Sequence, residues 1–420
     1  MRVLVLAHRM PFPPNKGDKI RSFNIVEHLA RRHNVALACL VDDGGDLRHV
    51  DTMRRRVGRF AFERIRPLIK KLWSLSSMLR GQPISVGFFY SRQLQREVDE
   101  IIATGIDAVL CICSPMAEYV FRSRHLANPS RHIVLIMDLI DIDSCKWGQY
   151  ARQKPFWTSW IYRYEAVHLA RYERRIAETF DELTVVSEQE MRMFPGGLQL
   201  PNLHAMSNGV DLAYFQPDGQ TKAANAPPII AFTGAMDYWP NVEGVRWFAE
   251  NVFPLVRREL PAAELYIVGS NPVREVQRLE ESEGITVTGY VDDVRDYLNL
   301  ADVCIAPLMI ARGIQNKVLE AMAMGKPVVC TPEALEGIAA TPGQHLVVAS
   351  GVADFATATV SLLCDRERAT RIGASARARV EAHYSWHANL RLLDRLLGDG
   401  ASDCAVDPDD EIVGESSNAQ

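Results

Sequence analysis

One segment of the chain sets a lysine and a glutamate three residues apart in a helical pattern. In GIQNKVLEAMAMGKPVV (313–329), Lys317 and Glu320 share one face of a helix that we expect to begin at Asn316 and to end at Gly325. A carboxylate there can accept both hydrogen bonds of a ribose diol, and a lysine near a helix N-terminus can hold a diphosphate. A surface Lys–Glu pair has the same spacing, so spacing alone leaves both interpretations open.

Two glycines stand where backbone N–H groups could approach an anion. Gly17 follows the loop HRMPFPPNK and opens a helical pattern, and Gly234 follows an apolar run in FTGAMDYWPN (232–241). Gly17 read alone could equally be an ordinary loop glycine. The chain contains neither GxGxxG nor GxxxxGK[ST], which argues against a dinucleotide site and a Walker-type site.

Three aspartates follow the apolar run IVLIM. Asp138, Asp141 and Asp143 lie in DLIDIDSCKWGQYA, and the last two could bind a divalent metal as a D-x-D pair. The same residues could instead form caps and turns at a domain edge. Because no other ligand set is evident, we favour a polar, substrate-facing role over a metal site.

The cysteines and the apolar runs bear on the cellular compartment. The eight cysteines form no CxxC pair and several lie in apolar runs, which is typical of reduced core thiols rather than of a disulfide framework or a zinc site. No stretch approaches 18 consecutive apolar residues, and the apolar core of MRVLVLA is too short for a signal peptide. We therefore expect a cytoplasmic protein without a membrane-spanning helix.

Short apolar runs alternate with longer helical patterns along the whole chain. Because these runs are continuous rather than alternating, they indicate strands that are buried on both faces, as in parallel sheets covered by helices. The strand-like runs are 2–7, 35–40, 108–114, 133–138, 182–187, 229–234, 264–269, 285–289, 303–307 and 327–331. The pattern predicts two α/β units in series.

Composition marks the boundaries between the units. We expect a first domain at 1–217, a polar linker at 218–228 and a second domain at 229–384, and we expect the amphipathic helix 385–397 to pack back on the first domain. Residues 399–420 contain seven acids and no base and have no helical period, which is typical of a disordered tail.

The overall charge of −5 is the average of unlike parts. Residues 1–210 carry +8 and residues 211–398 carry −6. Within the first part, 48–80 holds ten Arg or Lys against two acids, interleaved with Phe, Leu, Ile and Trp. Such a stretch can contact an anionic membrane, although an arginine-rich helix packed on the sheet would have the same composition. Nucleic acid is not an expected partner, because the second half is acidic and no reading motif occurs.

Five further motifs occur in order along the chain. They are NGVD (208–211), VGS (268–270), TGYVDDV (288–294), ADVCIAPL (301–308) and LEAMAMGKPVV (319–329). These motifs resemble family 4 glycosyltransferases, which have the GT-B fold, and the likeness covers roughly residues 1–397. More narrowly, PFPPNKGDKIRS, MDLIDIDSCKW, FTGAMDYWPN and GIQNKVLEAMAMGKPVV look like the sugar transferases associated with PEP-CTERM/exosortase exopolysaccharide loci.

The resemblance implies two Rossmann-like domains that face a cleft and a retaining hexose transfer without a metal or another cofactor. It implies a UDP- or GDP-linked sugar donor bound by the second domain, and a glycan or lipid-linked acceptor bound by the first. It places Glu320 at the donor ribose, Gly17 near the diphosphate and the acceptor, Gly234 in the phosphate loop, and Val291 at the base. Asn241, Gly269 and Asn316 lie in the matched motifs, and we expect them to contact the donor as well.

Two departures from the family pattern affect these expectations. The first glutamate of the family's E-x7-E motif is Arg312 here, and the Arg and Lys that commonly follow the phosphate loop are absent. We hypothesise that Arg312 and Lys317 supply the missing positive charge. Asp138 stands where the family often has a histidine, so Asp138 or Asp141 would accept bonds from sugar hydroxyls. A non-catalytic nucleotide-sugar-binding protein and a nucleotide-sugar epimerase on the same fold stay open.

Overall fold

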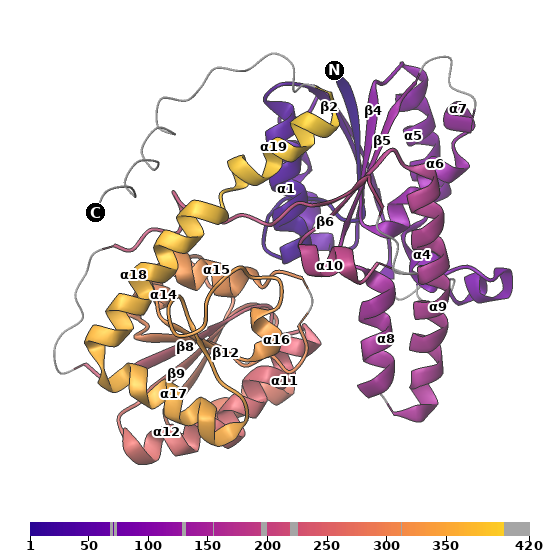
Figure 1. Cartoon of the computed structure of the whole chain (residues 1–420). Coiled ribbons are helices and arrows are strands. Elements are labelled where there is room, and N and C mark those ends of the chain that lie inside the picture. Colours follow the sequence, from indigo (N-terminus) through magenta and orange to yellow (C-terminus); the bar gives the residue numbers. More distant parts are fainter. Residues whose placement is uncertain are drawn as a thin grey trace, which may run out of the picture.

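The apolar runs of the sequence form the buried strands of two parallel sheets in a computed structural model of the chain (Figure 1). The structure describes residues 1–67, 70, 74–127, 132–153, 155–194, 200–218, 226–311 and 313–398. Helices cover both faces of each sheet, and the expectation of two Rossmann-like domains is confirmed.

The first sheet has seven strands among the described residues, in the order β3-β2-β1-β4-β5-β6-β7. Strand β1 pairs on one side with β2 and on the other with β4, in a register that places Val3 beside Val35 and Ala108. The strands are β1 (Arg2–Ala7), β2 (Asn34–Val41), β3 (Arg59–Arg64), β4 (Ala108–Ile112), β5 (Val134–Ile140), β6 (Glu182–Val185) and β7 (Leu203–Ala205).

The second sheet has six strands among the described residues, in the order β10-β9-β8-β11-β12-β13. In both sheets the strand order reverses beside the first strand of the domain, where parallel sheets bind ligands at their carboxyl ends. The strands are β8 (Ile229–Thr233), β9 (Glu264–Val268), β10 (Ile285–Gly289), β11 (Val303–Ala306), β12 (Val328–Cys330) and β13 (Val347–Val348).

The helices connect successive strands. In the first domain they are α1 (Gly17–Ala30), η1 (Gly44–His49), α2 (Val50–Arg54), η2 (Leu75–Arg80), α4 (Ile84–Phe89), α5 (Arg92–Ala103), η3 (Ser114–Met116), α6 (Ala117–Arg122), α7 (Arg124–Ala127), α8 (Asp143–Gln153), α9 (Phe156–Thr179) and α10 (Glu188–Arg192). From residue 226 onward they are α11 (Trp239–Trp247), η4 (Phe248–Val252), α12 (Phe253–Glu259), α13 (Arg274–Gln277), η5 (Arg278–Glu281), α14 (Val294–Leu300), α15 (Asn316–Ala323), α16 (Pro332–Leu335), α17 (Val352–Cys364), α18 (Arg366–His383) and α19 (Trp386–Leu396).

The basic stretch 48–80 is not one amphipathic helix. Its described residues contain the end of η1, helix α2, the edge strand β3 and the short helix η2. The strand forms because Phe60, Ala61 and Phe62 pair in register with β2. The alternative of a single arginine-rich helix packed on the sheet is therefore wrong.

The chain crosses between the domains twice, and the two crossings touch. The first crossing passes through Val210, which forms a parallel bridge with Ser385 of the second crossing. After α18, helix α19 returns to the first domain, where Trp386 and Leu390 join the core formed by β1, β2 and α1 (Figure 1). His28 of α1 and Asp394 of α19 lie 2.9 Å apart.

Two expected segments fall partly or wholly outside the described residues. Of the linker 218–228, the structure describes 218 and 226–228, and it describes none of the tail 399–420. No helix of the described chain is both long and apolar enough to cross a bilayer.

Candidate functional site

Lys317 and Asn241 converge at the carboxyl end of β8. Lys317 lies in the first turn of α15, and its ammonium group donates a hydrogen bond to the side-chain oxygen of Asn241. The Asn241 amide in turn donates to the Ala235 carbonyl at 2.9 Å. The ammonium group also lies 4.4 Å from the centroid of the buried Phe232 ring. The sequence forms this corner because an apolar strand and an uncapped helix N-terminus meet there.

Burial shifts the pKa of Lys317 and the pKa of Glu320, which lies one turn later in α15. Burial lowers the pKa of Lys317 to about 7, and the Glu320 carboxylate opposes that shift. Burial raises the pKa of Glu320 to about 7, and the Lys317 charge opposes it. Both groups therefore titrate close to neutral pH, as binding residues in partly dry sites often do.

Two glycines let the backbone pass close to the ammonium group. A Cβ atom at Gly234 would lie 2.7 Å from the Asn241 side-chain nitrogen and 3.0 Å from Lys317 Nζ. A Cβ at Gly269 would lie 1.7 Å from the Gly234 carbonyl oxygen, so the loops after β8 and β9 can touch only without a side chain. Val291 follows β10 on the same edge of the sheet and is half-buried. Gly234, Gly269 and Val291 thus lie at the carboxyl end of the second sheet, and their expected contacts with a donor stay a prediction.

A chain of polar contacts joins α15 to the first domain. Asn316 accepts a hydrogen bond of 3.1 Å from the amide of Asn208, and Asn208 accepts one of 2.8 Å from Arg21. A Cβ at Gly17 would lie 3.7 Å from the Asn316 amide nitrogen, so the start of α1 faces the start of α15. The two helix N-termini thus meet across the domain boundary, and Arg21 supports their junction from within.

Asp138 lies at the inner end of this chain and is fully buried. Arg21 binds both of its oxygens, with Nε–Oδ2 at 2.7 Å and Nη2–Oδ1 at 2.8 Å, and Thr184 donates a third bond of 2.8 Å. Neither Arg21 nor Asp138 exposes any side-chain surface. The expectation that Asp138 accepts bonds from sugar hydroxyls is corrected here, because its acceptor positions already hold protein donors. The residue positions Arg21 instead.

Asp141 lies against the second domain, and its expected substrate-facing role stays a prediction. A Cβ at Gly313 would lie 2.1 Å from Asp141 Oδ1, so this carboxylate touches the backbone of the second domain. Asp143 pairs with Lys146, and although burial lowers the pKa of Lys146, Asp143 and Asp141 raise it well above its usual value. Arg312 lies outside the described residues, so its expected role stays a prediction.

A histidine–aspartate pair that sequence reasoning did not single out lies at the end of β1. His8 Nε2 is 2.9 Å from Asp18, and Arg9 reaches the same carboxylate at 2.6 Å. Although burial raises it, the bonds and charges of His8 and Arg9 hold the pKa of Asp18 well below its usual range. Asp18 follows Gly17 directly, so the pair fixes the start of α1.

Aromatic side chains also connect the two domains, beside the loop that follows Gly234. The ring centroids of Tyr150 on α8 and Trp239 on α11 lie 5.8 Å apart, and the Tyr150 and Tyr238 hydroxyls lie 3.4 Å apart. Trp147 and Tyr162 pack against Tyr150 from within the α8–α9 hairpin. The packing brings helix α8 against the loop that follows Gly234.

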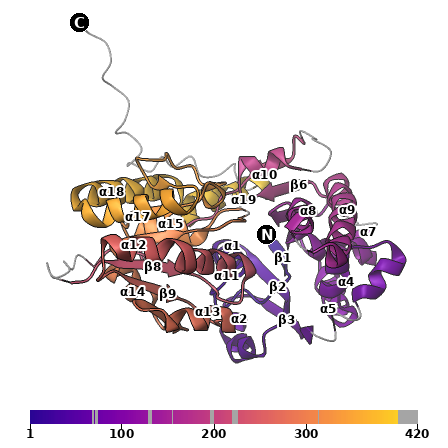
Figure 2. The ribbon, with the colours of Figure 1, turned by 90° about the horizontal axis from the view of Figure 1, so that it is seen from below.

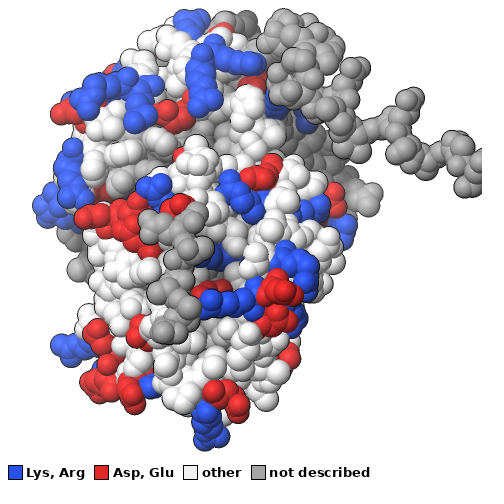
Figure 3. Space-filling view, turned by 90° about the vertical axis from the view of Figure 1, so that its left-hand side faces the viewer, with Lys and Arg blue, Asp and Glu red and all other residues white. Residues whose placement is uncertain are grey.

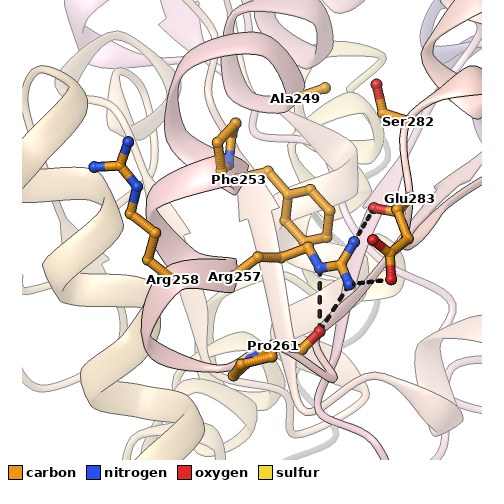
Figure 4. Close-up of a pocket in the computed structure, with 8 residues that line it drawn as sticks. Ala249, Phe253, Arg257, Arg258, Pro261, Ser282 and Glu283 are labelled. Atoms are coloured by element: carbon orange, nitrogen blue, oxygen red, sulfur yellow. Dashed lines mark hydrogen bonds and ion pairs between the residues drawn. The ribbon is translucent and has the colours of Figure 1, made fainter.

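Two pockets differ in their position relative to the cleft between the domains. A pocket of about 320 Å³ lies between the domains, with Gln149 and Arg152 of α8 on one wall and residues 309–311 and α16 on the other. A second pocket of about 420 Å³ lies on the second domain by α12 (Figure 4). There Arg257 donates to the carbonyls of Pro261 and Glu283 and to the Glu283 carboxylate, so it ties two loops together. Only the first pocket adjoins the cleft.

The structure shows no converging metal ligands among the described residues. Asp143, one half of the D-x-D pair, is bound by Lys146, and Ser114 donates to it at 3.5 Å. The site as described offers ammonium, amide, carboxylate and backbone groups. Those groups suit an anionic diphosphate and a diol.

Comparisons with known proteins agree with this geometry. Residues 227–365 match the family of glycosyl transferases group 1. The GDP-mannose-dependent alpha-(1-6)-phosphatidylinositol monomannoside mannosyltransferase of Mycobacterium tuberculosis is 30% identical over 257 residues, which cover 54% of this chain and 65% of that protein. The match therefore spans less than two thirds of that curated relative.

Two solved structures cover 95% of this chain. Sucrose-phosphate synthase from Thermosynechococcus elongatus has 17% identity and a TM-score of 0.69 over 98% of its length. Anabaena HepE in complex with UDP and glucose has 12% identity and a TM-score of 0.67 over its whole length. At such identities the likeness speaks for the fold. The chain has the GT-B fold, and its second domain matches the glycosyl transferases of group 1 over residues 227–365.

Proposed function

We propose that the chain is a glycosyltransferase that moves a sugar from a UDP- or GDP-linked donor to a glycan or lipid-linked acceptor. The observation that carries the proposal is the cluster of Gly234, Asn241, Lys317 and Glu320 at the carboxyl ends of the second sheet. This cluster faces Gly17 of the first domain, so a donor bound there would lie at the domain boundary.

The matched proteins support this choice of donor. The mycobacterial relative is named for its dependence on GDP-mannose, and the Anabaena structure holds UDP and glucose. A nucleoside diphosphate needs positive charge at its phosphates and acceptors at its ribose. In this chain the protonated Lys317 and the α15 N-terminus fit the first need, and the ionised Glu320 fits the second.

The proposed reaction retains the configuration of the transferred sugar and uses no metal or other cofactor. The acceptor would attack from the face that the diphosphate leaves, and the leaving phosphate would take up its proton. The protein would then contribute alignment and stabilisation of the diphosphate charge rather than a strong base. Asp141 would align a sugar hydroxyl, while Arg312 and Lys317 would stabilise the leaving group.

The proposal extends to the cellular role. We place the enzyme in exopolysaccharide biosynthesis, as the resemblance to exosortase-linked transferases implies. It would work in the cytoplasm, in peripheral contact with the inner face of the cell membrane. Such contact would give it access to a lipid-linked acceptor.

Calorimetric titration with UDP, GDP and ADP, followed by assay of hydrolysis of their sugars, tests the proposal. We expect one diphosphate to bind, and we expect Glu320→Ala to weaken its affinity at least tenfold, because a bond to a charged group contributes about 1.5–3 kcal/mol. Lys317→Ala should weaken the same affinity and lower turnover at least tenfold. The matched controls Glu275→Ala and Arg278→Ala, at exposed positions of the second domain, should change neither.

Absence of binding to every nucleotide would refute the proposed site. Binding without hydrolysis or transfer for any donor would favour the non-catalytic nucleotide-sugar-binding alternative.

A further inference from the structure

The largest exposed apolar side chains of the first domain gather around one helix. On α9, Phe156 is 83% exposed, Trp157 65%, Trp160 54% and Val167 50%. Leu79 of η2, at 91%, belongs to the same region, because the Tyr164 hydroxyl of α9 lies 3.2 Å from the Met78 and Gln82 carbonyls on either side of Leu79 and shares its one hydrogen between them. Scattered exposed apolar residues are ordinary, but a cluster of this kind marks a contact surface.

The exposed face of α9 carries mostly basic charge. Its stripe repeats at helical spacing through Phe156, Trp160, Arg163, Val167, Arg171 and Arg174, and the exposed Glu178 is the next position, so three arginines stand against one acid. On the opposite face Glu165 and Glu173 are buried. Glu165 accepts bonds from the Ile84 and Ser85 N–H groups, and Glu173 accepts two from Ser144. These two acids thus hold the helix to its own domain, and the exposed face keeps a net positive charge.

The position of α9 leaves this stripe uncovered by the second domain. Helix α8 lies between α9 and the second domain in both ribbon views (Figures 1 and 2). The left-hand face of the molecule, by contrast, mixes acidic and basic side chains (Figure 3). On the exposed stripe of α9 the aromatic side chains instead lie beside three arginines and one acid.

We propose that this α9 face, made of Leu79, Phe156, Trp157, Trp160, Arg163, Val167, Arg171 and Arg174, docks on a bilayer that contains anionic lipids. Tryptophan and phenylalanine favour the headgroup level of a bilayer, where an amphipathic helix can lie in the plane of the surface. The arginines match the negative surface potential of anionic headgroups. The surface is distinct from the strand-forming part of 48–80 and shares only the η2 segment with it.

Docking in this way would bring the cleft to the membrane. Helix α8, which forms a hairpin with α9, carries Tyr150 at the domain boundary and Arg152 in the pocket between the domains. The proposed lipid-linked acceptor would thus reach the cleft along the α8–α9 hairpin, whose helix α9 contacts the bilayer. That consequence rests on the proposed function, whereas the docking itself does not.

Co-sedimentation of the full chain with vesicles tests the docking without donor or acceptor. Vesicles of phosphatidylcholine alone are compared with vesicles that also contain phosphatidylglycerol, at low and high salt. We expect preference for the anionic vesicles and release at high salt. Arg163→Ala, Arg171→Ala and Arg174→Ala should each weaken binding by about fivefold. Phe156→Ser combined with Trp160→Ser should weaken it at least tenfold.

Matched variants on the second domain serve as controls. Leu300→Ser and Arg274→Ala combined with Arg278→Ala change exposed residues of the same kinds and should bind vesicles like the parent chain. An unchanged melting temperature in every variant shows that the protein is folded. Equal binding to neutral and anionic vesicles, or no effect of the α9 variants, would overturn the inference. So would a dimer that dissociates in the Phe156/Trp160 variant, because the face would then serve a second copy of the chain.

Discussion

Replacing Asp138 with asparagine separates a structural role from a catalytic one. The change keeps the size of the side chain and the Thr184 bond but leaves the Arg21 guanidinium buried without its counter-charge. Breaking one partner of a fully buried pair costs about 3–5 kcal/mol. For a domain of this size each kcal/mol lowers the melting temperature by about 2–4 °C, so a loss of about 6–20 °C is expected.

Calorimetric melting together with kinetics at a temperature where the variant is folded measures both roles. Because Arg21 supports Asn208 and through it Asn316, Asp138→Asn should raise the donor KM more than it lowers kcat. The control Asp51→Asn removes an exposed carboxylate paired with exposed Arg54 and should cost less than about 1 kcal/mol. An Asp138→Asn protein that melts like the parent yet has lost its turnover would refute this reasoning and return Asp138 to the substrate.

Two further predictions concern the nucleotide pocket. Nucleoside diphosphate affinity, measured by calorimetry from pH 6 to 9, should be highest near pH 7, because Lys317 binds the anion when protonated and Glu320 binds the ribose when ionised. Above pH 7 the affinity should fall by about tenfold per unit at most, and Glu320→Gln should move this fall to lower pH. An affinity that rises between pH 7.5 and 9 would contradict the role of Lys317. Gly269→Ala should weaken the same affinity at least tenfold, because the new methyl group would collide with the Gly234 carbonyl. The control Gly148→Ala adds a methyl group that meets nothing within 4 Å, so this variant should bind the nucleotide normally. Equal affinities in the two variants would count against the close approach of the two loops.

The sequence was most informative where a short apolar run is buried on both faces. All ten strand-like runs coincide with strands, because continuous apolar residues leave few alternatives in a helix-covered parallel sheet. The strands β3, β7 and β13 were not expected. β3 carries charged residues at an edge, and β7 and β13 are too short to give a pattern. Helix α15 was recognised because Gly325 and Pro327 mark its end.

The site was predictable where its residues are close in sequence and not where they are distant. Lys317 and Glu320 are one turn apart, so helical periodicity places them together. Arg21 and Asp138 are 117 residues apart, and nothing local distinguishes a buried arginine from the other bases of its segment. The α9 stripe carried a signal that a search for helical period would have found, since its arginines and aromatics recur every three to four residues.

The touching crossings at Val210 and Ser385 determine how the cleft can open. A Cβ at Gly209 would lie 2.4 Å from the Trp386 nitrogen, so the two connecting segments are in close contact. Two adjacent connections define a hinge axis. When one domain rotates about this axis, the displacement of a residue grows with its distance from the axis. Asn208 and Asn316 adjoin this axis and would stay in contact, while Tyr150 and Tyr238 at the far edge would separate first. The cleft would then open first at Tyr150 and Tyr238, where the sugar donor would enter. The contact between Lys317 and Asn241, which lies within the second domain, would keep its geometry.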